Sequence, residues 1–315
     1  MTARLPPIPL ENDFLRLAVL PEPGAKIYDL IAKPSGRNYL WHNPRIEPQP
    51  YPIDSNFDNY WCGGWDDIFP TADSCEHKGE VFPNCGELRS LRWHVESADS
   101  GRVVLSAFGP ISPVRAEKTV RIAGGVVAMT YSLRNLGPRE LDFLWGTHPA
   151  IAVKAGDILR VPAKTGLVAI SSTPAMGTPG ERYDWPFVEH EGGRTDMSRV
   201  QPVTASVNCG HYAMDLSGGW FAVEDAEDGS GILFRFPLEL CPYLWMWLVY
   251  GGWRGYHHAI IEPWTGYPVN LAEAVRAGRN RTLAAGETFE ATVRATPYHG
   301  SETWEKALER IDKCD

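Results

Sequence analysis

The sequence predicts a mostly β protein, built as a large antiparallel sandwich or barrel. Short segments alternate apolar and polar side chains with a period of two, as half-buried strands do. The 30 glycines and 26 prolines are spread along the whole chain and separate these segments with turns. Few stretches have helical periodicity, and no repeat of 20–50 residues marks a propeller. Many short strands with turns between them are typical of sandwiches and barrels.

Two segments carry the clearest strand patterns. The stretch EKTVRIAGGVVAMTYSLRN, residues 117–135, predicts a hairpin that turns at Gly124-Gly125. The stretch TFEATVRA, residues 288–295, predicts a half-buried strand in which Phe289 and Val293 share one face. Further strands are expected at 102–108, 140–145, 165–171, 219–224, 231–236, 244–250 and 258–262.

Helix is expected in only two places. Residues 270–277 begin with Asn270 and have Glu273 three positions later, which is the pattern of a capping box, and Gly278 follows the segment. The second helix is expected in SETWEKALERI, near the C-terminus. Because no linker of distinct composition divides the chain, we expect a single domain over residues 1–315.

Composition and charge narrow the classes of function. The chain of 315 residues is 43% hydrophobic and has a formal net charge of −9 without a long basic run. These values predict a folded core and argue against nucleic acid or an anionic membrane as the main partner. The expected partner is therefore a small molecule.

The N-terminal segment lacks the apolar run of a signal peptide, and no stretch approaches the roughly 18 apolar residues of a membrane span. The sequence therefore predicts a soluble, cytoplasmic protein. The six cysteines are scattered and form no CxxC pair, so we expect reduced thiols rather than disulfides or a zinc site. Compact metal-ligand spacings and phosphate-binding glycine loops are lacking, so no metal and no cofactor are predicted.

Glu262 lies in HHAIIEPWTGYP, at the end of an apolar run and directly before a proline and a tryptophan. It could be a salt-bridge partner, a metal ligand or a catalytic base, and the local spacing does not decide among these. It has the same parity as His258 and Ile260, so in a regular strand all three side chains point to one face.

His148, in LWGTHPAI, repeats this arrangement, since it also ends an apolar stretch and precedes a proline. A hydrogen-bonded structural histidine at a turn is the alternative to a functional one. Histidine is nevertheless the side chain best suited to donate a proton near neutral pH, and a carboxylate across a cleft is a natural partner base.

Aromatic side chains gather near acids in two segments. NYWCGGWDDIFPTAD contains Trp65, Asp66 and Asp67, and CPYLWMWLVYGGW contains Trp245 and Trp247. Aromatic faces beside carboxylates suit a sugar, whose ring has an apolar C–H face and a polar rim of hydroxyls. Core packing or a subunit interface would give the same pattern.

The stretch PNCGELRSLRWHV contains Cys85 and Arg89. The planar guanidinium of Arg89 could hold a ring hydroxyl or an anionic group through paired hydrogen bonds.

The order of these motifs resembles that of the aldose 1-epimerase (galactose mutarotase-like) superfamily. The resemblance rests on PEPGAKIYDLI, GGWDDIFPTAD, CGELRSLRW, WGTHPAI, IIEPWTGYPVNLAEAV and LAAGETF, in this order, and spans about residues 10 to 297. It implies a large β-sandwich of the supersandwich type with a sugar cleft and no cofactor.

The resemblance also implies roles for individual residues. The catalytic glutamate of the family falls on Glu262 and removes the proton from the anomeric hydroxyl. The catalytic histidine falls on His148 and protonates the ring oxygen, so that the ring opens and closes as the other anomer. Arg89, Trp65, Asp66, Trp247 and Cys85 are the expected substrate-binding residues.

Two departures from the family pattern concern substrate recognition. Cys85 stands where the family commonly has the histidine of His-Gly-x-x-Arg, although Arg89 is retained. The substrate-binding aspartate would fall near Gly210-His211-Tyr212, where this chain has no acid. The family's specificity for galactose therefore does not carry over.

The sequence thus predicts a cofactor-independent mutarotase or epimerase that acts on a free aldose or an aldose derivative. The alternative is a non-catalytic carbohydrate-binding or regulatory protein on the same fold. A lyase or hydrolase on this scaffold would usually need further catalytic domains. Several points stay open: the sugar, any anionic substituent on it, and the oligomeric state, monomer or homodimer. A bound hard cation that bridges a carboxylate and the sugar also stays open, as does the effect on catalysis of Cys85 in place of the family's histidine.

Overall fold

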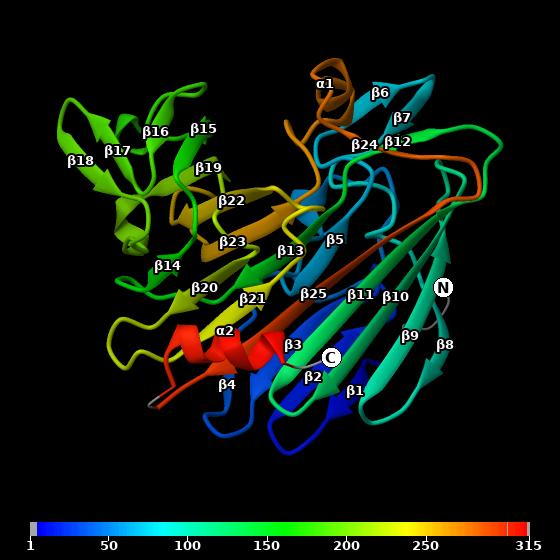
Figure 1. Ribbon diagram of the computed structural model, residues 1–315, viewed down its shortest axis with the longest axis horizontal. Helices are drawn as coiled ribbons and strands as arrows, with labels where there is room; N and C mark the ends of the chain where they lie inside the picture. Colours follow the sequence, from blue (N-terminus) through cyan, green and yellow to red (C-terminus); the bar gives the residue numbers. More distant parts are fainter. Residues whose placement is uncertain (1–4, 301, 314–315) are drawn as a thin grey trace. The chain divides into compact units, whose positions relative to one another are not determined.

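The computed structural model of the protein describes residues 5–300 and 302–313. Strands hold 47% of the residues and helices 8%, in large antiparallel sheets. The predicted fold class, a mostly β antiparallel sandwich with few short helices, is confirmed. The chain divides into two compact units (Figure 1).

Unit 1 comprises the described residues up to His148 together with Trp264–Val293, and unit 2 comprises Pro149–Pro263 and the described residues from Arg294 onwards. The divisions fall inside three strands, which are β13 (Gly146–Ile151), β23 (His257–Trp264) and β25 (Thr288–Tyr298). A single domain over residues 1–315 stays a prediction.

Unit 1 contains most of the strands in the first half of the chain. One sheet has β1, β2, β3 and β5 as successive neighbours, with β4 paired to β3, and a second sheet has the order β11-β10-β9-β8. Two small pairs, β6 with β7 and β12 with β24, complete it. The strand bounds are β1 (Ile8–Glu11), β2 (Leu15–Leu20), β3 (Lys26–Ala32), β4 (Arg37–Asn38), β5 (Trp65–Ile68), β6 (Cys75–His77), β7 (Glu80–Phe82), β8 (His94–Ala98), β9 (Arg102–Phe108), β10 (Val114–Ala123), β11 (Val126–Asn135), β12 (Leu141–Phe143) and β24 (Arg281–Leu283).

Unit 2 contains the strand order β23-β22-β19-β15-β16 and a second set, β14-β20-β21, that continues into the end of β25. The β17–β18 hairpin lies beside β16 in Figure 1. The strand bounds are β14 (Ile158–Arg160), β15 (Thr165–Ser171), β16 (Arg182–Asp184), β17 (Phe187–His190), β18 (Gly193–Asp196), β19 (Val207–Met214), β20 (Trp220–Glu224), β21 (Gly231–Arg235) and β22 (Tyr243–Tyr250).

The hairpin predicted at 117–135 is present as β10 and β11, which pair from Ala123 and Val126 at the turn to Val114 and Asn135. Gly124 has a φ of 52°, a left-handed conformation that glycine adopts without steric cost. In β11 the odd-numbered side chains from Val127 are buried, as the alternation predicts. The predicted strands at 102–108 and 165–171 are β9 and β15 with the same bounds.

Both predicted helices are present. In α1 (Leu271–Arg276) the side chain of Asn270 accepts a hydrogen bond from the backbone N–H of Glu273, so the cap forms as predicted. The C-terminal helix is α2 (Trp304–Asp312), and the predicted start at Ser301 lies outside the described residues. Three short 3₁₀ helices lie at Phe57–Asn59, Pro174–Met176 and Val203–Ala205.

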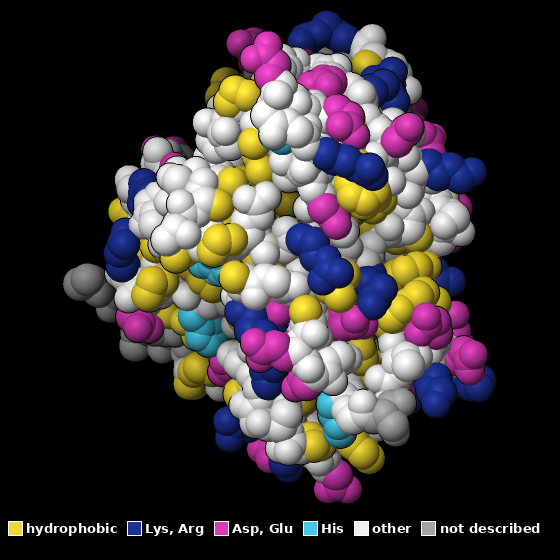
Figure 2. Space-filling view, turned by 90° about the vertical axis from the view of Figure 1, so that its left-hand side faces the viewer, with side chains coloured by type: hydrophobic (Ala, Val, Ile, Leu, Met, Phe, Trp, Pro, Cys, Tyr) yellow, Lys and Arg dark blue, Asp and Glu magenta, His cyan; other side chains and the backbone are white. Residues whose placement is uncertain are grey.

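The cysteines, the helices and the surface charges can be compared with the predictions of reduced thiols and no membrane span. Cys62, Cys75, Cys85, Cys209 and Cys241 are thiols rather than disulfide partners, and Cys314 lies outside the described residues. In the described part of the chain, each helix is too short or too polar to cross a bilayer. Lys and Arg side chains are interspersed with Asp and Glu on the face shown in Figure 2.

Candidate functional site

Strand β5 places two adjacent aspartates on opposite faces. All four of its residues, Trp65–Ile68, are buried. Because side chains alternate along a strand, Asp66 and Asp67 point away from each other. Asp66 forms an ion pair with Lys26 at 3.1 Å, and Asp67 forms one with Lys118. Buried charges need such partners, since desolvating an unpaired charge is costly.

Lys26 is the buried cation that joins Asp66 to the turn before β5. Its ammonium group is buried and donates hydrogen bonds to the Gly63 carbonyl at 2.7 Å and to the Cys62 sulfur at 3.3 Å. Burial is the largest single cause and lowers the pKa of Lys26, but the charge of Asp66, its hydrogen bond and the charges of Cys62 and Tyr51 together outweigh burial and raise the pKa above the ordinary value. Lys26 is therefore a permanent cation on this face.

His148 lies in β13, and 4% of its side-chain surface is exposed. Its ring meets the rings of Phe57 and Trp61 edge to face, with centroids 6.1 and 5.7 Å away. The indole N–H of Trp61 donates to Asp66 at 3.3 Å, so the histidine, this tryptophan and the ion pair form one cluster. We call His148, Phe57, Trp61, Asp66 and Lys26 the His148 cluster.

The pKa of His148 is lowered to about 4. Burial is the largest cause, because it disfavours the charged ring. Asp66 acts in the opposite direction, whereas the cations Lys26 and Arg89 lower the pKa further. At pH 7 the imidazole is therefore neutral, and it donates and accepts hydrogen bonds without carrying charge.

Arg89 ties together the segment that covers Phe57. Its Nε and Nη2 atoms donate to the Asn84 carbonyl at 3.1 and 2.8 Å, and its Nη1 atom donates to the Tyr51 hydroxyl at 2.9 Å. The guanidinium lies over the rings of Tyr51 and Phe57, 5.3 and 4.8 Å from their centroids. Arg89 is 3% exposed, so the contacts described for it organise the protein. Its role as a sugar ligand stays a prediction.

A tight turn precedes Arg89 and explains two residues of the CGELR motif. Cys85 and Gly86 have φ values of 57° and 75°. A side chain on Gly86 would come within 2.1 Å of the Phe69 carbonyl oxygen, so glycine is required there. Glu87 accepts hydrogen bonds from the backbone N–H groups of Ile111 and Ser112 and anchors the turn to the next loop. Cys85 is 9% exposed, and its part in binding is not tested by these contacts.

Gly24, from the predicted PEPGAKIYDLI motif, holds the other side of this turn. It has a φ of 71°, and a side chain there would lie 2.4 Å from the Arg89 carbonyl oxygen. Its N–H donates to the Leu91 carbonyl. Trp65, by contrast, is 1% exposed, and its indole N–H donates to the Thr147 hydroxyl. These are the contacts of a core side chain, and binding by Trp65 also stays a prediction.

In unit 2, Glu262 lies in β23 and is 2% exposed. The strand is buried almost throughout, from His258 to its end, so neither of its faces is solvated. His258 contacts the ring of Trp247 edge to face at 5.3 Å. Glu262 belongs to unit 2 and His148 to unit 1.

Trp247 is the most exposed of the aromatic candidates in β22. Its indole N–H donates to the Asn208 side chain at 2.8 Å, and its ring lies 4.9 Å from that of Trp253. Gly210 lies opposite Trp247 in β19, and a side chain at Gly210 would strike Trp245. A half-buried tryptophan beside an amide has both contacts that a sugar ring uses, an apolar face and a hydrogen-bonding group.

Sequence reasoning missed several members of these clusters. Lys26, Tyr51, Phe57 and Asn208 were not predicted. A lysine in a strand is normally expected to face the solvent. The only sign in the sequence that Lys26 is buried is the later pair Asp66-Asp67, which offers it a buried counter-charge. Among the described residues, no group of three or more His, Cys, Asp or Glu side chains is arranged to hold a metal ion.

No protein-family model and no curated protein matches the sequence. Solved structures do match it in fold. The Slr1438 protein from Synechocystis sp. PCC 6803 is 20% identical, with a TM-score of 0.69 over 95% of this chain and 98% of that one. A galactose mutarotase-like protein from Lactobacillus casei ATCC 334 is 16% identical, with a TM-score of 0.69 over 93% and 100%.

A galactose mutarotase related enzyme from Lactobacillus acidophilus is also 16% identical, with a TM-score of 0.68 over 94% of this chain and 99% of that one. At these identities the likeness establishes the fold. The superfamily resemblance stated from the sequence motifs is thereby confirmed at the level of architecture. The chain has the galactose mutarotase-like fold over nearly its whole length.

Proposed function

We propose that the protein interconverts the anomers of an aldose or aldose derivative. The observation that carries the proposal is the His148 cluster, in which a buried, neutral imidazole lies against aromatic rings and a buried ion pair on this fold. Perturbed titratable groups that lie together are characteristic of functional sites, because catalysis needs groups whose pKa values are matched to their task.

In the proposed reaction Glu262 is the general base. Its carboxylate takes the proton from the anomeric hydroxyl, and the bond between the anomeric carbon and the ring oxygen breaks. As that bond breaks, His148 gives its N–H proton to the ring oxygen, which becomes a hydroxyl. The neutral imidazole is left with a negative charge, which the nearby cations Lys26 and Arg89 offset. Rotation of the open-chain carbonyl and reversal of the proton transfers give the other anomer.

Substrate recognition belongs to the same proposal. Trp247 would support the C–H face of the sugar, Asp66 would accept from a hydroxyl, and Arg89 with Cys85 would border the anomeric region. Trp65 would act by holding Thr147, its neighbour in the His148 strand.

The proposal is tested by magnetisation-exchange NMR over a panel of aldoses, comparing the wild type with Glu262→Gln. The amide keeps the size of the side chain but accepts no proton, so we expect turnover to fall roughly 10²–10⁴-fold with affinity within a few-fold. Glu224→Gln is the matched control, because Glu224 lies in β20 of the same unit and its carboxylate pairs with Arg160. If Glu262→Gln keeps the parent rate, the base is another residue.

A non-catalytic carbohydrate-binding protein is the second candidate. Cys85, in place of the histidine of the resembled family, favours it. The same experiment separates the two functions: the binding protein shows saturable sugar binding and leaves the uncatalysed exchange rate unchanged.

A further inference from the structure

The β6–β7 hairpin is an isolated pair of strands in unit 1. It forms a two-stranded sheet of its own, with His77 opposite Glu80 at its tip. Of its six strand residues, only Phe82 is buried. Two paired strands are marginally stable alone, and segments with few buried contacts are the first to open locally. The position of the hairpin therefore depends on its contacts with the rest of the unit.

One carboxylate holds the tip of the hairpin. Asp142, in the neighbouring strand β12 (Figure 1), accepts from His77 Nε2 at 2.8 Å and from Lys78 Nζ at 2.7 Å. Asn280 donates to its other oxygen at 2.9 Å. Burial acts to raise the pKa of Asp142, but the hydrogen bonds and charges of Lys78 and His77 outweigh burial and lower the pKa below its ordinary value. We call the contacts of this ionised carboxylate with His77 and Lys78 the Asp142 latch.

The turn at the tip has the backbone of a type I′ hairpin loop. Lys78 and Gly79 have φ values of 51° and 84°. Glycine adopts this left-handed region without cost, whereas a lysine rarely does. The ammonium group of Lys78 contacts Asp142 from this conformation, so the latch also holds the turn.

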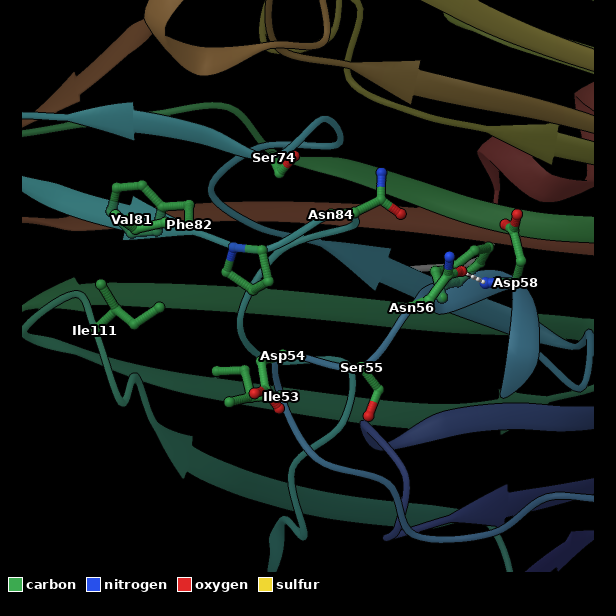
Figure 3. Close-up of a pocket in the computed structure, with 12 residues that line it drawn as sticks. Ile53, Asp54, Ser55, Asn56, Asp58, Ser74, Val81, Phe82, Asn84 and Ile111 are labelled. Carbon is green, nitrogen blue, oxygen red and sulfur yellow. Dashed lines mark hydrogen bonds between the residues drawn. The ribbon is translucent and has the colours of Figure 1, made fainter.

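Two cavities give the hairpin room to move. Figure 3 shows the first, of about 680 Å³, with Val81 and Phe82 of β7 beside Ile111. The second, of about 470 Å³, is lined by the tip of the hairpin and again by Phe82 and Ile111. Close packing normally holds a segment in one position. Because β7 borders open space in both cavities, it can shift without displacing a tightly packed core.

The hairpin continues directly into the segment that Arg89 holds. Asn84 lies two residues after Phe82, and its carbonyl accepts two hydrogen bonds from the Arg89 guanidinium, at 3.1 and 2.8 Å. Asn84 and Phe57 both line the first cavity, and the ring of Phe57 meets His148 edge to face. A shift of β7 therefore moves groups that lie next to the His148 cluster.

We propose that the β6–β7 hairpin is a mobile flap that is closed by the Asp142 latch and that opens the cavity next to the His148 cluster when the latch is released. As the tip moves, Asn84 follows β7 and the segment held by Arg89 loosens. The flap does not depend on the proposed reaction, because its opening is measured on the protein alone.

Hydrogen–deuterium exchange measures the opening directly. In the wild type, the amides that pair β6 with β7 should exchange faster than those of β10 and β11. Asp142→Asn keeps the size of the side chain and an acceptor for Asn280 but loses the charge. Exchange in the hairpin should therefore rise roughly tenfold or more, the scale of losing a hydrogen bond to a charged group. Exchange at residues 84–89 should rise with it, and that of β10 and β11 should not.

The cysteines give an independent readout. Cys75 lies in β6 and is half-buried, whereas Cys62, Cys209 and Cys241 are fully buried. Alkylation by iodoacetamide, followed for each peptide by mass spectrometry, should become several-fold faster at Cys75 in Asp142→Asn. The three buried thiols should keep the parent rate.

Glu140→Gln is the matched control, because it removes an exposed carboxylate two residues from the latch. Lys78→Gln breaks the latch from the hairpin side and should give a weaker form of the same pattern, since His77 still pairs with Asp142. Equal hairpin exchange in Asp142→Asn and Glu140→Gln would overturn the flap. Faster alkylation of the buried thiols in Asp142→Asn would also overturn it, because the carboxylate would then stabilise the whole unit.

Stopped-flow binding of a sugar links the flap to access. Association and dissociation should both accelerate in Asp142→Asn, with the dissociation constant little changed, because an open flap lowers the barrier for entry and exit alike. Unchanged rates of association and dissociation would refute control of access. The expected exchange and alkylation patterns in a protein that accelerates no anomerisation would support the flap and refute only the proposed reaction.

Discussion

Each face of strand β5 has a buried aspartate–lysine ion pair, but the side chains around the two pairs differ. Asp66 and Asp67 are both nearly fully buried, and each is paired with a buried lysine. On the Asp67 face, Lys118 also donates to the Ala25 carbonyl and lies near the rings of Trp93 and Tyr131. On the Asp66 face, the ion pair lies beside His148 and Arg89.

This difference separates a structural ion pair from a candidate functional one. On the Asp67 face the ion pair joins two sheets, because Lys118 lies in β10 of one sheet and Asp67 lies in β5 of the other. Burial raises the pKa of Asp67, and the charge of Lys118 opposes that shift. On the Asp66 face, the charges of Asp66 and Lys26 also change the pKa of a third titratable group, His148. The two faces should therefore respond to mutation in different measurements.

The largest effect is expected on turnover at the Asp66 face. His148→Asn keeps a hydrogen-bond donor but transfers no proton, so anomerisation should slow roughly 10²–10⁴-fold. His211→Asn is the control, because His211 is fully buried and its ring nitrogen bonds only the Tyr183 hydroxyl among the contacts described for it. Exchange NMR should show an intact rate for His211→Asn. Equal losses in both variants would mean that His148 acts through stability alone.

The Asp67 face should respond in stability. Lys118→Met leaves Asp67 buried without its counter-charge, so the free energy of unfolding should fall by about 3–5 kcal/mol. Denaturant titration measures it, and turnover per folded molecule should stay at the parent value. Lys118→Met combined with Asp67→Leu should regain much of the loss, since an apolar pair needs no charge compensation. A single variant within 1 kcal/mol of the parent would contradict the assignment.

The stability of the protein should fall in acid because of His148 on the Asp66 face. The pKa of His148 is about 4 in the folded protein and 6.5 ordinarily, so the unfolded chain binds the proton first as the pH falls. The contribution of His148 to stability is therefore complete above pH 6.5 and is lost between about pH 6.5 and 4, by up to about 3 kcal/mol.

Unfolding curves at several pH values should show this loss in the wild type and in Lys118→Met. The loss should be smaller in His148→Asn. Burial also lowers the pKa of His211 to about 4, so part of the pH dependence should persist in that variant. An unchanged slope in His148→Asn would show that the imidazole is not held neutral by its surroundings.

The smallest effect is expected from Arg89→Lys. The ammonium keeps the charge but loses the planar fork that joins Asn84 to Tyr51, so sugar affinity should weaken by roughly 1–3 kcal/mol. Arg92→Lys is the control, because Arg92 pairs with Glu22 rather than with this segment. Calorimetry with the best-bound sugar measures this change in affinity. An unaltered dissociation constant for Arg89→Lys would show that the guanidinium does not contribute to sugar binding.

The sequence predicts local structure well where one side of a strand is solvated. The β10–β11 hairpin and β9 follow from alternation and turn residues, since these signals are local. Lys26 is different, because its burial depends on Asp66, which lies far along the chain. For the site, the motif order indicates Glu262 and His148, but the neutral state of His148 depends on burial and on charges from three separate segments.

The backbone at Cys85 has a consequence for protein engineering. With a φ of 57°, position 85 requires a residue that tolerates the left-handed region, and histidine is among the residues enriched there, whereas β-branched residues are disfavoured. Gly86 supplies the close approach to Phe69 whatever residue precedes it. The backbone at position 85 is therefore compatible with the histidine of the resembled family, and Cys85→His tests by a single substitution whether this position influences the proposed sugar binding.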